Sequence, residues 1–173
     1  LVFMVFSIIF SANANLCWFT HTVGALFAGT VFMYLAYRVP KRGAIAIMGI
    51  IVGAVGLLMG MFWSGPVGVV GGIVADLIAG DPQKRTKTKL ICAFAAFTFC
   101  FWLGQISLIL MMGEAYAEMC VQAGMTLEYG QTLVNSILSP MGVVTGAATI
   151  AGGLVGGFIG TKVFSKHFAK LGM

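Results

Sequence analysis

The chain has 173 residues, of which 60% are hydrophobic and 9% are charged, whereas about 25% of residues are charged in a typical soluble domain. This composition excludes an ordinary soluble globular domain. The net charge of +5 does not indicate a nucleic-acid partner, because the basic residues lie at the ends of apolar segments. We therefore expect a single integral membrane domain over residues 1–173, in contact with the lipid bilayer.

Six apolar segments follow one another along the chain, and we predict a transmembrane helix in each: residues 1–17, 19–37, 44–62, 67–79, 90–112 and 141–164. A helical crossing of the bilayer takes about 20 residues. The fourth segment is shorter, so it needs a tilt, part of its flanking turn or local thinning of the bilayer. The first segment begins without Met or charge, and we expect cytoplasmic residues upstream of Leu1.

All ten Lys and Arg residues lie in three clusters, within residues 38–42, 84–89 and 162–170. These clusters follow the second, fourth and sixth segments, and basic loops of membrane proteins lie on the cytoplasmic side. Residues 114–139 hold three of the five acidic residues and no basic one, so we expect them outside, partly as a short helix over the bundle. The prediction is an all-α membrane protein with six transmembrane helices and both termini cytoplasmic, in the bacterial inner membrane.

The last segment is rich in glycine at four-residue spacing. Gly152, Gly156 and Gly160 form one ridge, and Gly153 and Gly157 form another. Such ridges allow helix backbones to approach closely. Two interpretations remain open: packing within this chain's own bundle, or docking to another membrane subunit through Gly152, Gly156 and Gly160.

Polar and aromatic side chains gather near the predicted outer ends of the helices. They are a belt of interfacial residues in contact with water, or they line a site for a small organic ligand. The candidate substrate-binding residues are Asn13, Asn15, His21, Trp63, Trp102, Met111 and Tyr116.

Asp76 is the one acidic residue within an apolar segment, and membrane carboxylates are costly and often functional. Because Asp76 lies near a basic loop, pairing with Lys84 or Arg85 is the structural alternative. A proton relay would need further acidic residues at the same depth, and the sequence has none.

The four cysteines have no metal-ligand spacing. Cys92 and Cys100 lie within an apolar segment, where cysteine behaves as a small hydrophobic residue. Cys17 and Cys120 are expected near the outer surface, where a disulfide between them stays open as an alternative. The sequence also lacks nucleotide-binding, metalloprotease and serine-hydrolase motifs. We therefore expect no enzymatic activity, no cofactor and no metal site.

Several motifs together resemble those of the MptS (Trep_Strep) family of bacterial membrane proteins. They are the GGIVADLI sequence of residues 71–78 before a short basic loop, Glu114-Ala115-Tyr116, Glu128-Tyr129-Gly130, and the glycine-rich ending of residues 152–172. The family is counted among the substrate-binding S components of energy-coupling-factor (ECF) transporters. The resemblance implies a six-helix protein that works with a transmembrane coupling (T) subunit and two ABC-type ATPases. In S components, small residues on the first helix dock to the T subunit, and Ser7/Ser11 is the comparable pair here.

The resemblance implies capture of a scarce micronutrient from outside, with ATP hydrolysed by the partner subunits. The resemblance does not assign the substrate. Vitamins and their precursors dominate S components, and the Met- and aromatic-rich outer half with His21 would also suit haem, because imidazole and thioether groups bind haem iron. Binding is expected in the outer half, under residues 114–139 acting as a lid. The alternative is a free-standing secondary transporter or channel, which needs a polar path through the bundle.

Overall fold

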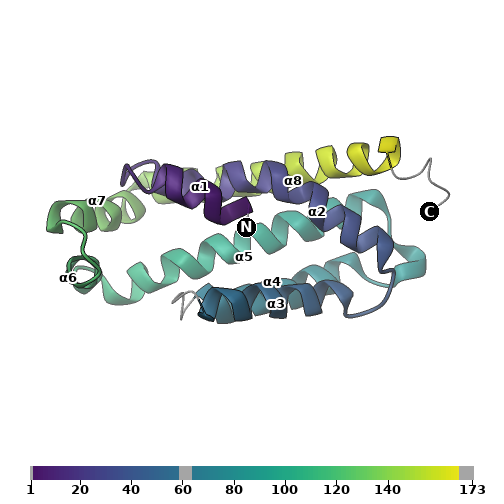
Figure 1. Cartoon of the computed structure of the whole chain (residues 1–173), viewed down its shortest axis with the longest axis horizontal. Helices are drawn as coiled ribbons and strands as arrows, with labels where there is room; N and C mark the ends of the chain where they lie inside the picture. The colour runs from purple at the N-terminus through teal and green to yellow at the C-terminus, as the bar shows by residue number, and fades with distance from the viewer. Residues whose placement is uncertain (1, 59–63, 168–173) are drawn as a thin grey trace.

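The computed structural model describes residues 2–58 and 64–167, and within them it contains helices and no strands. The helices are arranged as an elongated bundle in which α2, α5 and α8 run along the long axis (Figure 1). Two short 3-10 helices, η1 (Cys17–Phe19) and η2 (Pro82–Lys84), precede α2 and α5. The α-helices are α1 (Val2–Phe10), α2 (Thr20–Arg38), α3 (Ala44–Leu58), α4 (Ser64–Ala79), α5 (Lys87–Met112), α6 (Ala115–Gln122), α7 (Leu127–Leu138) and α8 (Pro140–His167).

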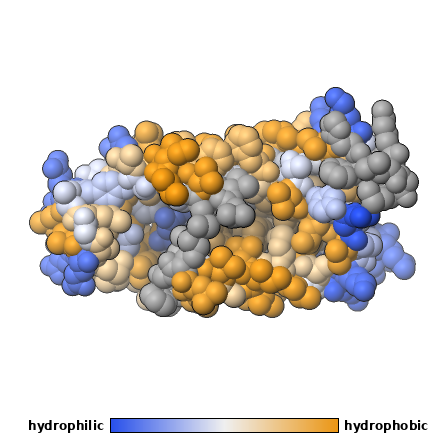
Figure 2. All heavy atoms as spheres, viewed as in Figure 1, coloured by the Kyte–Doolittle hydropathy of each residue, from blue (hydrophilic) through white to orange (hydrophobic). Residues whose placement is uncertain are grey.

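Three stretches of the described residues are long and apolar enough to cross a membrane: Cys17–Arg38, Lys87–Met112 and Pro140–Lys166. At a rise of 1.5 Å per residue, the 26 residues of α5 extend about 39 Å. Two shorter apolar helices, Ala44–Leu58 and Gly65–Ala79, lie beside them. The space-filling view shows an apolar middle between two hydrophilic ends (Figure 2), which is the pattern of a membrane-embedded bundle.

The first predicted helix is shorter than expected, because α1 ends at Phe10 and residues 11–16 form turns. Polar side chains there bond to nearby backbone groups and so compete with the helix. The Ser11 hydroxyl donates to the Ile8 carbonyl at 3.1 Å, and the Asn13 side chain accepts from the Asn15 backbone N–H at 2.9 Å. The sequence prediction of a helix over residues 1–17 was therefore too long.

Residues 114–139 form two helices, where the sequence predicted a partly helical segment. Glycines in positive-φ conformations precede each helix, Gly113 at φ 55° and Gly124 at φ 86°, a region that side chains with a Cβ atom avoid. Thr126 caps α7 by accepting a hydrogen bond from the Tyr129 backbone N–H at 3.2 Å. The result is a helical hairpin, α6–α7, at one end of the bundle (Figure 1).

The described residues of the three basic clusters lie at the other end of the bundle, which we call the basic end. Arg42 pairs with Asp81 at 2.8 Å, and the Arg85 guanidinium donates to the Lys41 carbonyl at 3.3 Å. These contacts join the first two clusters. The rings of Tyr37 and Phe164 stack with centroids 4.4 Å apart, which places the third cluster beside the end of α2. The prediction that the clusters share one side of the bundle agrees with this arrangement.

Asp76 joins three segments at the basic end. Its carboxylate accepts from the backbone N–H groups of Gly43 at 2.9 Å and Ile45 at 3.3 Å, at the start of α3. It also pairs with Arg85 at 3.5 Å, and the Arg85 side chain is only 5% exposed. A carboxylate at a helix N-terminus is favoured by the helix dipole. The structure thus confirms the predicted structural role of Asp76, with Arg85 as the partner.

The two glycine ridges of α8 contact two different helices. A Cβ atom added to Gly152 would lie 2.7 Å from the Thr22 carbonyl oxygen of α2, and one added to Gly160 would lie 2.5 Å from that of Gly29. Gly156 likewise abuts the Ala25 backbone. On the other ridge, an added Cβ of Gly153 would lie 2.7 Å from Ala95 of α5. Only glycine allows α2, α5 and α8 to pack this closely.

Gly152, Gly156 and Gly160 are therefore buried inside the bundle. This arrangement corresponds to the first of the two interpretations of the ridge, packing within the chain's own bundle. Their burial against α2 leaves them no free surface for a second membrane subunit.

Candidate functional site

A buried cluster lies where α6 and α7 cover the ends of α5 and α8. We call it the tryptophan cluster and its surroundings the α6–α7 end. Its residues come from the segment before α2, from the last half of α5 and from the hairpin: Ala14, Trp18, Trp102, Ile106, Ile109, Cys120, Leu133, Val134 and Ile137. Partly buried Cys17, Phe99, Tyr116 and Tyr129 pack around it. This layer of apolar and aromatic side chains has the composition of a small-molecule site.

Two buried donors in this cluster have no acceptor among the described residues. The indole N–H groups of Trp18 and Trp102 are both buried and unpaired, in side chains that are 1% and 5% exposed. A buried tryptophan N–H normally finds an acceptor, and leaving one unpaired costs about 1–3 kcal/mol. Two such donors in one cluster indicate a place where an acceptor from outside the chain would be stabilised.

His21 lies at the start of α2 and is 5% exposed. Its ring lies 5.9 Å from that of Phe101 on α5. The neighbouring Thr22 hydroxyl lies 3.4 Å from that of Thr149 on α8. The histidine is thus part of the bundle interior and does not belong to a water-exposed interfacial belt, which was one of the two interpretations of the sequence.

The segment between α1 and α2 is tied to α7 by two hydrogen bonds. The Tyr129 hydroxyl donates to the Ser11 carbonyl at 2.6 Å, and the Ser136 hydroxyl donates to the Asn15 side chain at 2.9 Å. Residue pairs 118 and 121 positions apart in the chain are joined in this way. Both bonds are between neutral groups, so they hold the hairpin in place without an ion pair.

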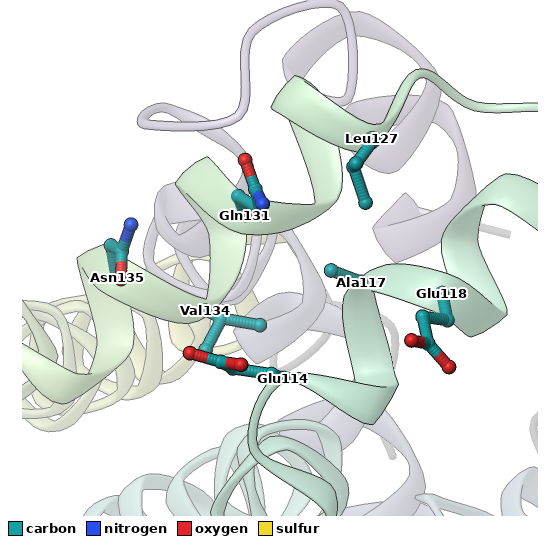
Figure 3. A pocket seen from close by; sticks show the side chains of 7 residues that line it. All are labelled: Glu114, Ala117, Glu118, Leu127, Gln131, Val134 and Asn135. Carbon is teal, nitrogen blue, oxygen red and sulfur yellow. The ribbon is translucent and has the colours of Figure 1, made fainter.

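A depression of about 410 Å³ lies on the surface of the hairpin, between α6 and α7 (Figure 3). The carboxylates of Glu114 and Glu118 lie on its α6 side, and the amides of Gln131 and Asn135 on its α7 side. Val134, which forms part of its wall, also belongs to the tryptophan cluster. The depression and the tryptophan cluster therefore share one wall residue.

Oxygen atoms from carboxylates and amides are the groups that hard cations prefer. However, no group of three or more His, Cys, Asp or Glu side chains able to hold a metal ion occurs among the described residues. Glu114, Glu118 and Glu128 instead give this end a negative charge, because the described Lys and Arg residues belong to the three clusters of the basic end. This field attracts cations and repels anions.

The structure brings some of the predicted site residues together and separates others. Trp102 is in the tryptophan cluster, and Tyr116 is partly buried against it. Burial raises the pKa of Tyr116 to about 12, with smaller contributions from Cys120, Cys17 and Tyr129. Asn13 and Asn15 are exposed in the turns before α2, and Asn15 bonds to α7.

Two predicted residues fall outside this group. Met111 is 68% exposed and follows Phe101 by ten residues, or about 15 Å along α5. It is therefore not placed beside His21, and haem binding through these two side chains stays a prediction. Trp63 lies outside the described residues.

Trp18, Ser136 and Tyr129 were not among the candidate substrate-binding residues, although Tyr129 belongs to the Glu128-Tyr129-Gly130 motif. Trp18 has a sequence signal, since it stands directly before the polar group around His21. Ser136 and Tyr129 lie on a segment with weak helical patterning, and their partners are more than 100 residues away. Only the packing of α7 against the start of α2 identifies them.

These features define an all-α integral membrane protein with a buried aromatic cluster under a helical hairpin at one end and charged loops at the other. The Trep_Strep family model, described as a hypothetical bacterial integral membrane protein, matches residues 1–170. The chain belongs to this family of bacterial integral membrane proteins. No curated protein and no solved structure matches the chain.

Proposed function

We propose that the chain is the substrate-binding subunit, or S component, of an ECF-type ABC importer. In this proposal six helical segments, α1 to α5 and α8, embed the protein in the inner membrane, with both termini cytoplasmic. The basic end then faces the cytoplasm, as the positive-inside rule requires. The α6–α7 end faces outward and captures a small molecule, and the T subunit and two ABC-type ATPases drive its release inward.

The pair of buried indole N–H groups under the hairpin is the observation that carries this proposal. A bound solute with carbonyl, carboxyl or ring-nitrogen acceptors would satisfy both donors and recover their desolvation cost. The α6–α7 hairpin acts as the lid over this site. The negative charge around the depression favours a neutral or cationic solute over an anionic one.

The described helices contain no charged path that would support the rival function, a free-standing secondary transporter or channel. Asp76 is the acidic residue within a described apolar helix, and it is engaged by Arg85 and by two backbone N–H groups at the basic end. Residues buried in the middle of the bundle are mostly apolar or glycine. Conduction through such an interior is unfavourable for ions.

The test combines partner capture with ligand recovery from the tagged full-length chain, purified from its native membranes in mild detergent. We expect a second membrane protein and two ABC-type ATPases to co-purify, and native mass spectrometry to show a bound small molecule. The double variant W18F/W102F keeps the aromatic rings and removes both donors. It should fold, retain its partners and lose the bound molecule.

Exposed Phe158 lies away from the cluster, and F158L is the matched control that should keep both partners and ligand. A chain that is purified alone, under conditions that preserve known complexes, contradicts the S-component assignment. Ion-gradient-dependent uptake by the isolated chain in vesicles would favour the secondary transporter. Full ligand retention by W18F/W102F would remove the indoles from the site.

A further inference from the structure

Two cysteines from distant parts of the chain lie at the tryptophan cluster, and both are free thiols in this structure. Cys120 of α6 is 4% exposed and is a member of this cluster, and Cys17, the first residue of η1, packs against it. Tyr116 of α6 and Tyr129 of α7 pack against the same cluster. The two thiols therefore border one buried group of side chains.

The other two cysteines lie in different surroundings. Cys92 and Cys100 are both on α5, in its apolar span. Cys100 packs against α4, where a Cβ atom added to Gly71 would lie 2.8 Å from the Cys100 Cβ atom. Neither is a member of the tryptophan cluster. The chain thus offers one cysteine pair at the α6–α7 end and two internal controls.

We propose that Cys17 and Cys120 form a disulfide that ties α6 to η1 and holds the α6–α7 hairpin closed. This inference rests on the proposed function in one respect, the placement of the α6–α7 end outside the cell, where disulfides persist. The bond would add a covalent link to a contact that is otherwise made by neutral hydrogen bonds and apolar packing. An oxidised lid would then open less often than a reduced one.

The oxidant is a disulfide, R–S–S–R, of a protein or of a small thiol such as oxidised glutathione. The thiolate of Cys17 attacks one sulfur, forms a mixed disulfide and releases the first R–S⁻. The thiolate of Cys120 then attacks the Cys17 sulfur of the mixed disulfide and releases the second R–S⁻. The two protons lost by the cysteines convert these products to two R–SH, so atoms and electrons balance.

Two conditions control the rate of this exchange: the thiol must be ionised, because only thiolates react, and it must be accessible. Burial raises the pKa of Cys120, so the second step is slow while α6 stays packed and at neutral pH. We expect the reaction to accelerate between pH 7 and about 8.5.

The experiment uses the full chain in lipid nanodiscs, first reduced and then treated with oxidised glutathione at about pH 8.5. Mass spectrometry after maleimide labelling should show the loss of two free thiols, and a non-reducing digest should join the peptides of Cys17 and Cys120. The variants C17S and C120S should each abolish this cross-link. C92S and C100S should leave it unchanged.

The structural consequence is measured by amide hydrogen exchange of residues 115–122, which should slow by about tenfold on oxidation and recover after reduction. The readout needs no ligand and no partner subunit. Recovery of the glutathione adducts alone, or a cross-link that includes Cys92 or Cys100, overturns the proposal. If the Cys17–Cys120 bond is confirmed but the chain is purified without partners, the disulfide proposal is supported and the S-component function is rejected.

Discussion

The two ends of this bundle are held together by different kinds of interaction. At the basic end, Asp76 and Arg85 connect the start of α3, the end of α4 and the loop before α5 through charged hydrogen bonds. At the α6–α7 end, the hairpin is held by apolar packing and two neutral hydrogen bonds to the segment before α2. Charged hydrogen bonds are about twice as strong as neutral ones. In the proposed function the basic end is the fixed part, and the hairpin is the part that opens.

Unpaired buried groups also differ between the two ends. The indole donors of Trp18 and Trp102 both lie in the apolar tryptophan cluster. At the basic end, Tyr37 and Arg85 each have a buried atom with no partner among the described residues. Tyr37 packs against the apolar core and stacks on Phe164, and Arg85 already pairs with Asp76. At the α6–α7 end, by contrast, both unpaired donors belong to one cluster.

The largest effect is expected for the variant G156L, in the glycine ridges of α8. In G156L the new side chain meets the Ala25 backbone of α2, and neither helix can move without separating the core. We expect destabilisation by more than about 3 kcal/mol, seen as loss of the monodisperse protein in detergent gel filtration. V155L is the control, since Val155 is 49% exposed. Normal folding of G156L would contradict the close packing of α2 and α8.

The second largest effect is expected for D76N at the basic end. The substitution leaves the Arg85 guanidinium, 5% exposed, without its counter-charge. It also weakens the acceptor for two backbone N–H groups. We expect a loss of about 2–3 kcal/mol, measured by thermal unfolding in detergent.

D81N is the matched control, because the Arg42–Asp81 pair is exposed, at 75% and 36%, and exposed pairs contribute little. Equal effects of D76N and D81N would mean that the basic end is not held by the buried pair.

A smaller and more local effect is expected for S136A at the α6–α7 end. The change removes the 2.9 Å hydrogen bond to Asn15 and costs about 1 kcal/mol. Hydrogen exchange should become faster in residues 127–138 and stay unchanged in α3 and α4. S165A is the control at the opposite end, where the hydroxyl bonds only to its own helix. Faster exchange throughout the bundle would show that the hairpin does not open independently.

The smallest expected effect concerns acidification of the basic end. A hydrogen bond from the Gln83 backbone, followed by the contact with Arg42, lowers the pKa of Asp81. Its folded-state pKa is below the unfolded value, so its contribution is present above about pH 3.9 and is lost as the pH falls through the lowered pKa. The difference in melting temperature between wild type and D81N should therefore shrink in that range. A difference that grows on acidification would contradict the assigned sign.

Much of the fold was predictable because hydropathy and charge are read along the chain. The predicted bounds of α2 and α5 differ from the structure by at most three residues, and the pairing of Asp76 with Arg85 was one of the stated alternatives. The first helix was predicted too long, since the local hydrogen bonds of Ser11 and Asn13 end it early. For residues 114–139 the sequence predicted a partly helical segment, whereas the structure has two helices.

The candidate site was less predictable. Of the candidate residues, Trp102 and Tyr116 lie in or against the tryptophan cluster, whereas Met111 lies on the exposed face of α5; their roles in binding stay predictions. Trp18 stands before the polar group around His21 in the sequence, but only packing places it in the same cluster as Trp102, 84 positions further along the chain. No periodicity in the sequence contains that information.

The sequence by itself determined the class of protein, the position of its apolar helices and the grouping of its charges, because transfer of apolar segments into a bilayer depends on local composition. The tertiary structure decided which helix each glycine ridge meets, which donors stay unpaired and which cysteines lie at the same buried cluster. These outcomes depend on how helix faces pack against one another. Packing is set by the shapes of side chains that are distant in sequence.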